Sequence, residues 1–162
     1  VEINKGAFFK SNKQKLLAQE VEDINAFLQG FYPTSNGQTG RAYLENDEIL
    51  VIKNFPLPSI FKPDHVDLVL LLPNYPQQPP HGIHVLQSSN NQRLLEQLKV
   101  IYHHTYDSAV VGEAVDIPNY SWICYHYNVF KWHFSTENRK TGDNVAKYLN
   151  NWRVSLDEVA GE

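Results

Sequence analysis

The sequence predicts a domain of the α+β class. A segment with helical periodicity lies near each end, several short β-prone segments separated by turn signals lie between them, and the strand–helix–strand alternation of a parallel sheet is missing. The chain has 162 residues, of which 42% are hydrophobic and 12% aromatic. That length and composition suffice for one core, so we expect a single domain over residues 1–162.

A helix is predicted from Ser11, a good N-cap residue, to about Gln29. Apolar residues recur at helical spacing along it, and charged residues are expected to fill the opposite face. The apolar residues are Leu17, Val21, Ile24 and Leu28. Gly30 and Pro33 are expected to end the helix.

Three strands follow and predict an antiparallel meander, with Asn46-Asp47 as the first hairpin turn and three prolines in the second connection. The strands span Arg41 to Glu45, Glu48 to Phe55 and His65 to Leu72. The aliphatic run Leu68 to Leu72 indicates burial on both faces of the sheet.

The third strand leads through Pro73-Asn74 into Tyr75-Pro76-Gln77-Gln78-Pro79-Pro80, which we call the proline crossover. Proline fixes its own φ, donates no backbone hydrogen bond and restrains the preceding residue to extended geometry. The crossover is therefore expected to be a rigid extended segment rather than a flexible linker.

Beyond the crossover we predict a strand at Gly82 to Leu86, a helix at Asn90 to Tyr102 and a loop from Thr105 to Asn119. Tyr120 to Phe130 is aromatic and β-prone, either as a strand or as an ordered extended segment. Asp143 is expected to cap a last helix with one apolar stripe. That stripe contains Ala146, Leu149, Trp152, Arg153 and Leu156.

Charge and composition argue against several classes of function. The net charge is −4 and the longest basic cluster is the pair Arg139-Lys140, so we expect no nucleic-acid partner. No apolar run approaches the roughly 18 residues of a membrane span. The polar start from Val1 to Lys5 lacks a signal-peptide pattern, and the single cysteine fits a reducing compartment, so we expect a cytoplasmic protein. We also expect no cofactor: the chain has no glycine-rich phosphate loop, and the histidines at 103 and 104 lack evident partners for a metal.

Two motifs resemble those of ubiquitin-conjugating enzymes. One is Leu72-Pro73-Asn74 followed by the proline crossover; the other is Ile123-Cys124, placed eight residues before Trp132. The resemblance implies the ubiquitin-conjugating-enzyme-like fold: an antiparallel meander flanked by an N-terminal and a C-terminal helix, with Cys124 as the catalytic residue.

The chain also departs from the common pattern of that family. The family's His-Pro-Asn triplet is expected about ten residues before the cysteine, where Ala114 to Asp116 stand, and Pro118-Asn119 comes too late. The forty-four residues from Pro80 to Cys124 are roughly double the family's spacing, and the predicted helix from Asn90 fits that insertion.

The layout is more similar to a divergent bacterial branch, the prokaryotic ubiquitin-conjugating-enzyme-like family E. Its Trp, small residue, His and Trp pattern matches Trp122, Cys124, His126 and Trp132. In that branch the position of Cys124 can also be serine.

Cys124 and His126 are the candidate catalytic pair. Cysteine is the softest nucleophile available at neutral pH, and i, i+2 spacing on an extended segment would place both side chains on one face. His126 would lower the thiol pKa as imidazolium or act as a base when neutral. Asn119 and Asn128 are the nearest candidate oxyanion donors, and Asn119 is favoured. The alternative is that Cys124 is a small buried hydrophobe.

The resemblance implies a transferase of a bacterial ubiquitin-like modification pathway. Its expected partners are a ubiquitin-like protein, an adenylating activating enzyme and a deconjugating protease. The alternative is an inactive conjugating-enzyme-like scaffold that binds a ubiquitin-like protein or its activating enzyme. A cysteine hydrolase is less favoured because the chain shows no third group to orient a base.

Overall fold

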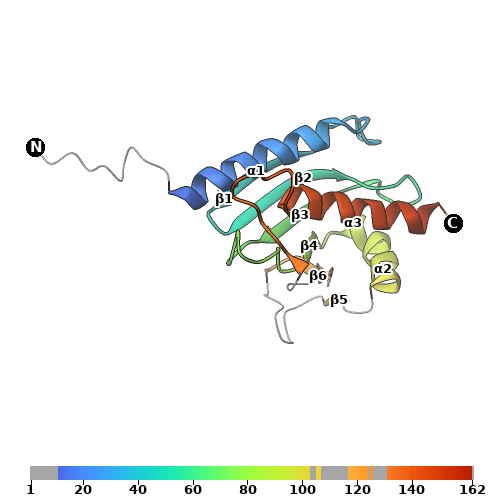
Figure 1. Ribbon diagram of the computed structural model, residues 1–162. Coiled ribbons are helices and arrows are strands. Elements are labelled where there is room, and N and C mark those ends of the chain that lie inside the picture. Colours follow the sequence, from blue (N-terminus) through green and yellow to red (C-terminus); the bar gives the residue numbers. More distant parts are fainter. Residues whose placement is uncertain (1–10, 103–104, 107–116, 124, 126–130, 162) are drawn as a thin grey trace, which may run out of the picture.

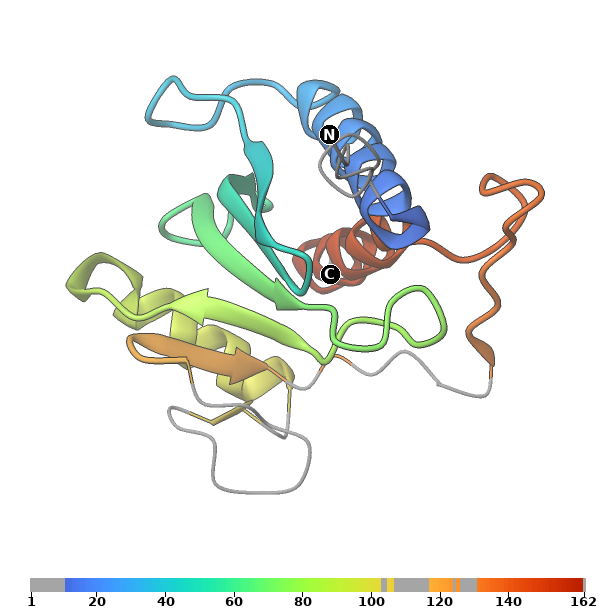
Figure 2. The same ribbon diagram turned by 90° about the vertical axis from the view of Figure 1, so that its left-hand side faces the viewer.

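The computed structural model describes residues 11–102, 105–106, 117–123, 125 and 131–161. Six strands form one sheet in the order β1-β2-β3-β4-β6-β5, and every neighbouring pair is antiparallel. The strands are β1 Arg41–Asn46, β2 Ile49–Pro56, β3 His65–Leu71, β4 Ile83–Leu86, β5 Thr105–Tyr106 and β6 Tyr120–Ile123. Helices α1 Asn12–Gln29 and α3 Val145–Ala160 lie together on one face of the sheet (Figure 1; Figure 2). The α+β class and the meander are therefore confirmed.

Helix α1 begins where the sequence predicts. The Ser11 hydroxyl accepts from the Gln14 amide at 3.2 Å, and the Gln14 side chain accepts from the Ser11 amide at 3.0 Å, which forms a capping box. The helix ends before Gly30, whose φ is −70°, so the end is helical rather than left-handed.

The free edge of the sheet at β1 is partly covered by α1. The Asn25 side chain accepts from the Ala42 amide at 2.8 Å and donates to the Ala42 carbonyl at 3.0 Å. One side chain thereby satisfies both backbone groups that a neighbouring strand would otherwise engage.

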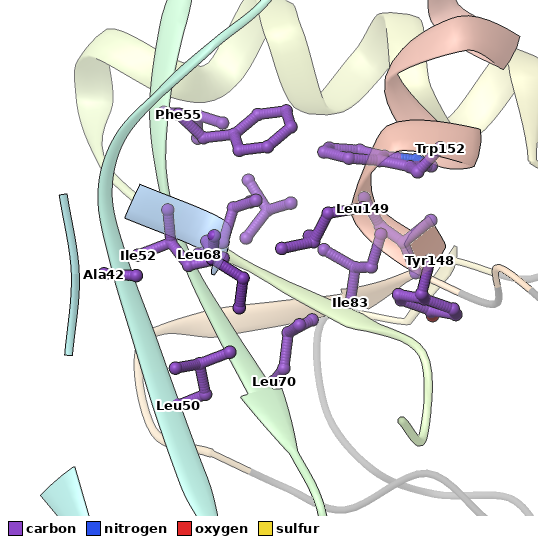
Figure 3. Packing of buried hydrophobic residues seen from close by; sticks show 14 of the residues in the cluster. Ala42, Leu50, Ile52, Phe55, Leu68, Leu70, Ile83, Tyr148, Leu149 and Trp152 are labelled. Carbon is purple, nitrogen blue, oxygen red and sulfur yellow. The ribbon is translucent and has the colours of Figure 1, made fainter. Parts of the chain in front are cut away.

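The core lies between the helices and the inner face of the sheet. The Phe55 ring of β2 packs against Trp152 of α3 with centroids 5.3 Å apart, and Leu68 of β3 is fully buried below them (Figure 3). Val69 points to the opposite face of β3 and is only 5% exposed. Burial on both faces of this strand is therefore confirmed around Leu68 and Val69.

The last helix starts one residue later than expected. Asn144, not Asp143, is the N-cap, and its side chain accepts from the Lys147 amide at 2.8 Å. Asp143 instead accepts from the His133 amide at 2.7 Å. Asp and Asn are both good N-cap residues, so the local sequence does not show which of the two caps the helix. The contact of Asp143 with His133 leaves Asn144 as the N-cap.

The predicted helix after β4 is present as a short 3-10 turn, η2 Ser89–Asn91, followed by α2 Gln92–Ile101. Its three buried leucines join the same hydrophobic cluster as the buried residues of α1 and α3. They are Leu94, Leu95 and Leu98.

The prediction of a loop from Thr105 to Asn119 was wrong for its first two residues. Thr105 and Tyr106 form the strand β5, which pairs with β6. A two-residue strand defined by a partner distant in sequence leaves no periodic signal of its own. The β-prone segment from Tyr120 is a strand as far as Ile123, and Tyr125 follows it outside regular structure. Within the described part of the chain, no helix is long and apolar enough to cross a membrane.

Candidate functional site

Cys124, His126 and Asn128 lie outside the described residues, whereas Ile123 and Tyr125, on either side of Cys124, are described. Ile123, directly before Cys124, is fully buried in β6 and pairs with Ile83 on one side and Thr105 on the other. Tyr125, directly after it, donates its amide to the Ile123 carbonyl at 2.9 Å. The residue before Cys124 therefore lies in an interior strand, and the residue after it is hydrogen-bonded back to that strand.

Helix α3 holds the residue after Cys124. The Tyr148 hydroxyl donates to the Tyr125 carbonyl at 3.1 Å, and the two rings meet edge to face at 5.3 Å. Tyr102 contacts the Tyr125 ring at 6.3 Å, also edge to face. Burial raises the pKa of both Tyr102 and Tyr125, so both hydroxyls stay neutral near neutral pH.

The proline crossover lies next to the segment that follows the candidate site. The Trp132 indole N–H donates to the Pro76 carbonyl at 2.9 Å. Tyr75 is 2% exposed and meets Phe134 edge to face at 5.6 Å. Tyr75 thus belongs to the core, and the two motifs of the family resemblance contact each other.

A second tryptophan joins the other end of the crossover to β6. The Trp122 indole N–H donates to the His81 carbonyl at 2.8 Å. Gly82 has a φ of +73°, and a Cβ built on it would lie 2.4 Å from the Trp122 Nε1 and 2.7 Å from the Ile123 carbonyl oxygen. Only glycine fits this approach, which holds the end of the crossover against the residues preceding Cys124.

Asn119 lies at the other end of β6 from Cys124. It is exposed, adopts a φ of +69°, and accepts the Gln87 amide on its backbone carbonyl at 2.7 Å. A four-residue strand spans roughly 13 Å, so β6 separates Asn119 from Ile123. Its role as oxyanion donor stays a prediction, and the length of β6 argues against it.

A buried carboxylate near the crossover was missed at the sequence level. Glu20 is 1% exposed on the inner face of α1, and its Oε2 accepts the Val145 amide at 2.6 Å. Arg139 donates to Glu20 Oε1 at 3.3 Å and also pairs with Asp23. The available signal was spacing, because Glu20 stands three residues after Leu17 and four before Ile24 and so falls within the apolar stripe.

Burial outweighs the favourable contacts of this carboxylate. Desolvation raises the pKa of Glu20, while the Val145 amide and Arg139 oppose the rise. Burial, reinforced by the charge of Glu20, raises the pKa of the Tyr75 hydroxyl as well.

Among the residues that the structure describes, no group of three or more His, Cys, Asp or Glu side chains could hold a metal ion. No protein-family model, no curated protein and no solved structure matches this chain. The comparisons therefore assign the chain to no family.

Proposed function

We propose that the protein is a conjugating enzyme of a bacterial ubiquitin-like modification pathway, with Cys124 as the carrier residue and a ubiquitin-conjugating-enzyme-like fold. The observation that carries the proposal is the hydrogen bond from Trp132 to Pro76. It joins the two motifs of the resemblance through residues that are 56 positions apart in sequence. The order of α1, the β1–β3 meander, the crossover, β4 and α3 also supports the proposal.

Transfer to Cys124 would be a thioester exchange. The Cys124 thiolate attacks the carbonyl carbon of the ubiquitin-like C-terminus carried on the activating enzyme's thiol. A new C–S bond forms, the old C–S bond breaks, and the activating enzyme leaves as its thiolate. An acceptor amine then attacks the new thioester, loses a proton and releases Cys124.

His126 would take the base role in the second step, or would stabilise the Cys124 thiolate as a cation in the first. Neutral Tyr102 and Tyr125 would flank the segment without accepting a proton, because burial raises the pKa of both. ATP would be consumed by the activating enzyme rather than by this chain.

The alternative is a scaffold that binds a ubiquitin-like protein or its activating enzyme without chemistry. The observation that favours it is the position of Ile123, fully buried in a strand with partners on both sides. Because Ile123 is buried and paired on both sides, its position is compatible with a buried, unreactive cysteine at 124.

An adduct assay separates the two functions. The chain is mixed with a cognate activating enzyme, the ubiquitin-like protein and ATP, and run on gels with and without reducing agent. For a carrier we expect a thiol-sensitive band that Cys124→Ala abolishes and that Cys124→Ser converts to a thiol-resistant band. A complex on gel filtration without a covalent band would reject the carrier and leave the scaffold.

A matched pair of histidine variants tests the base. His126→Ala should slow discharge of the adduct to an amine, by about a hundredfold or more if general base catalysis operates. His133→Ala is the control, because His133 is exposed and its described hydrogen bonds use only backbone atoms. Equal effects of the two variants would remove His126 from the mechanism.

A further inference from the structure

We propose that Glu20 is a positioning residue, which fixes Trp132 against the proline crossover by anchoring the intervening loop of residues 133–143 to helix α1. The inference deepens the proposed function, and its consequence for transfer rests on that function. The positioning itself can be tested on the isolated chain.

Glu20 joins three parts of the molecule at one carboxylate. The residue belongs to α1, its Oε2 accepts the first amide of α3 from Val145 at 2.6 Å, and its Oε1 accepts from Arg139 at 3.3 Å. The side chain is almost fully excluded from water, so a loss of these partners would not be replaced by hydration. Arg139 is the member of the 133–143 loop that reaches α1.

The 133–143 loop is closed at its base and should move as a unit. The Asp143 amide donates to the His133 carbonyl at 2.6 Å, and the Asp143 carboxylate accepts from the His133 amide at 2.7 Å. The Asn144 side chain donates to the Arg139 carbonyl at 3.1 Å. A displacement at Arg139 is therefore passed to His133 and to its neighbour Trp132.

Trp132 and Phe134 connect the 133–143 loop to the proline crossover. Trp132 donates to the Pro76 carbonyl, and Phe134 packs edge to face on Tyr75. Tyr75 in turn lies close enough to Glu20 for the charge of the carboxylate to raise the pKa of the Tyr75 hydroxyl. Glu20 is therefore linked to the crossover in two ways: through the 133–143 loop, and directly through Tyr75.

The charge on Glu20 is set by groups from every element around it. Asp23 of α1 disfavours the carboxylate, whereas Arg139 and the Val145 amide favour it. The charge of Glu20 in turn raises the pKa of the Tyr75 hydroxyl in the crossover. Burial tips this balance and raises the pKa of Glu20, so its proton is lost at higher pH than that of exposed glutamates. Loss of the charge weakens the hold on Arg139.

The test follows the indole N–H resonance of Trp132 by NMR between about pH 4 and pH 8, assigned with Trp132→Phe. In the wild type we expect this resonance to shift with the titration of the Glu20 carboxyl carbon. In Glu20→Gln it should be independent of that titration and stay at the acidic wild-type position, since glutamine mimics the protonated acid. The Trp152 indole, packed against Phe55, is the internal control.

Asp23→Asn is the matched variant. Asp23 is the other acidic partner of Arg139 and is more exposed than Glu20. The variant removes the charge of Asp23 and leaves Glu20 in place, so the Trp132 resonance should still shift with the titration of Glu20. If Trp132 is unaffected by the Glu20 titration, or responds equally in Glu20→Gln and the wild type, the positioning role is overturned.

The consequence for transfer is tested on the loaded enzyme. Glu20→Gln should slow discharge of the adduct to an amine by about ten- to a hundredfold while partner binding is unchanged. Discharge at the wild-type rate would overturn the role in transfer. Failure of the wild type to form any adduct would instead reject the proposed function, and the NMR result would still decide whether Glu20 positions Trp132.

Discussion

Replacing Gly82 by alanine should disturb the segment before Cys124 more than any other exchange of a described glycine with positive φ. At a φ of +73° an alanine costs about 1–2 kcal/mol. The new Cβ would also lie 2.4 Å from the Trp122 Nε1 and 2.7 Å from the Ile123 carbonyl oxygen, and such overpacking costs about 1–3 kcal/mol. We therefore expect a total loss of about 2–5 kcal/mol in the free energy of unfolding.

Gly37 provides the matched control. Its φ is also +73°, but a Cβ there would meet nothing within 4 Å, so Gly37→Ala should lose only the conformational part. For a chain of this size the extra loss at Gly82 corresponds to a melting temperature about 2–12 °C below that of Gly37→Ala. Denaturant and thermal unfolding by circular dichroism measure both variants. Equal losses would refute the close approach of the crossover to β6.

Three further predictions concern the helices, the core and pH. Asn144→Ala should lower the unfolding free energy by about 1 kcal/mol in denaturant titrations, because the Lys147 amide loses the side-chain oxygen that accepts its hydrogen bond. No change would contradict the assignment of Asn144 as the N-cap. Leu68→Ala should cost about 2–5 kcal/mol, since Leu68 is fully buried, and a loss below 1 kcal/mol would contradict that burial. The native pKa of Glu20 is raised, so the native state binds more protons than the unfolded chain above pH 4.5, and this group's contribution to stability should fall as pH rises through that window. Unfolding measured across the window should lose this slope in Glu20→Gln, and an unchanged slope would assign it to another group.

Local chemistry explains why much of the fold could be predicted. The Ser11 cap and the apolar spacing of α1 each act within a few residues of chain, and both are present as expected. The proline crossover was predicted to be extended, and this was wrong: residues 73–77 form turns, in which the Gln78 amide donates to the Asn74 carbonyl at 2.9 Å. The contact between Trp132 and Pro76 was not predicted, since spacing alone does not bring two such distant residues together.

The features that escaped prediction depend on distant partners. Charged residues were expected opposite the apolar stripe of α1, yet Glu20 lies within that stripe, and Val145 and Arg139 compensate its burial from the far end of the chain. β5 exists only through its pairing with β6. Asn119 was chosen for its nearness in sequence to Cys124, but an extended strand turns nearness in sequence into separation in space.

The contact between Asn25 and Ala42 bears on how copies of this protein meet one another. An uncovered edge strand can template the addition of a strand from another molecule, the first step toward swapped dimers and fibrils. Asn25 occupies both backbone groups of Ala42, the second residue of β1, so an incoming strand could not form its hydrogen bonds there. Asn25→Ala should therefore expose this edge to self-association as well as weaken the fold, so a single amide in α1 serves both solubility and stability.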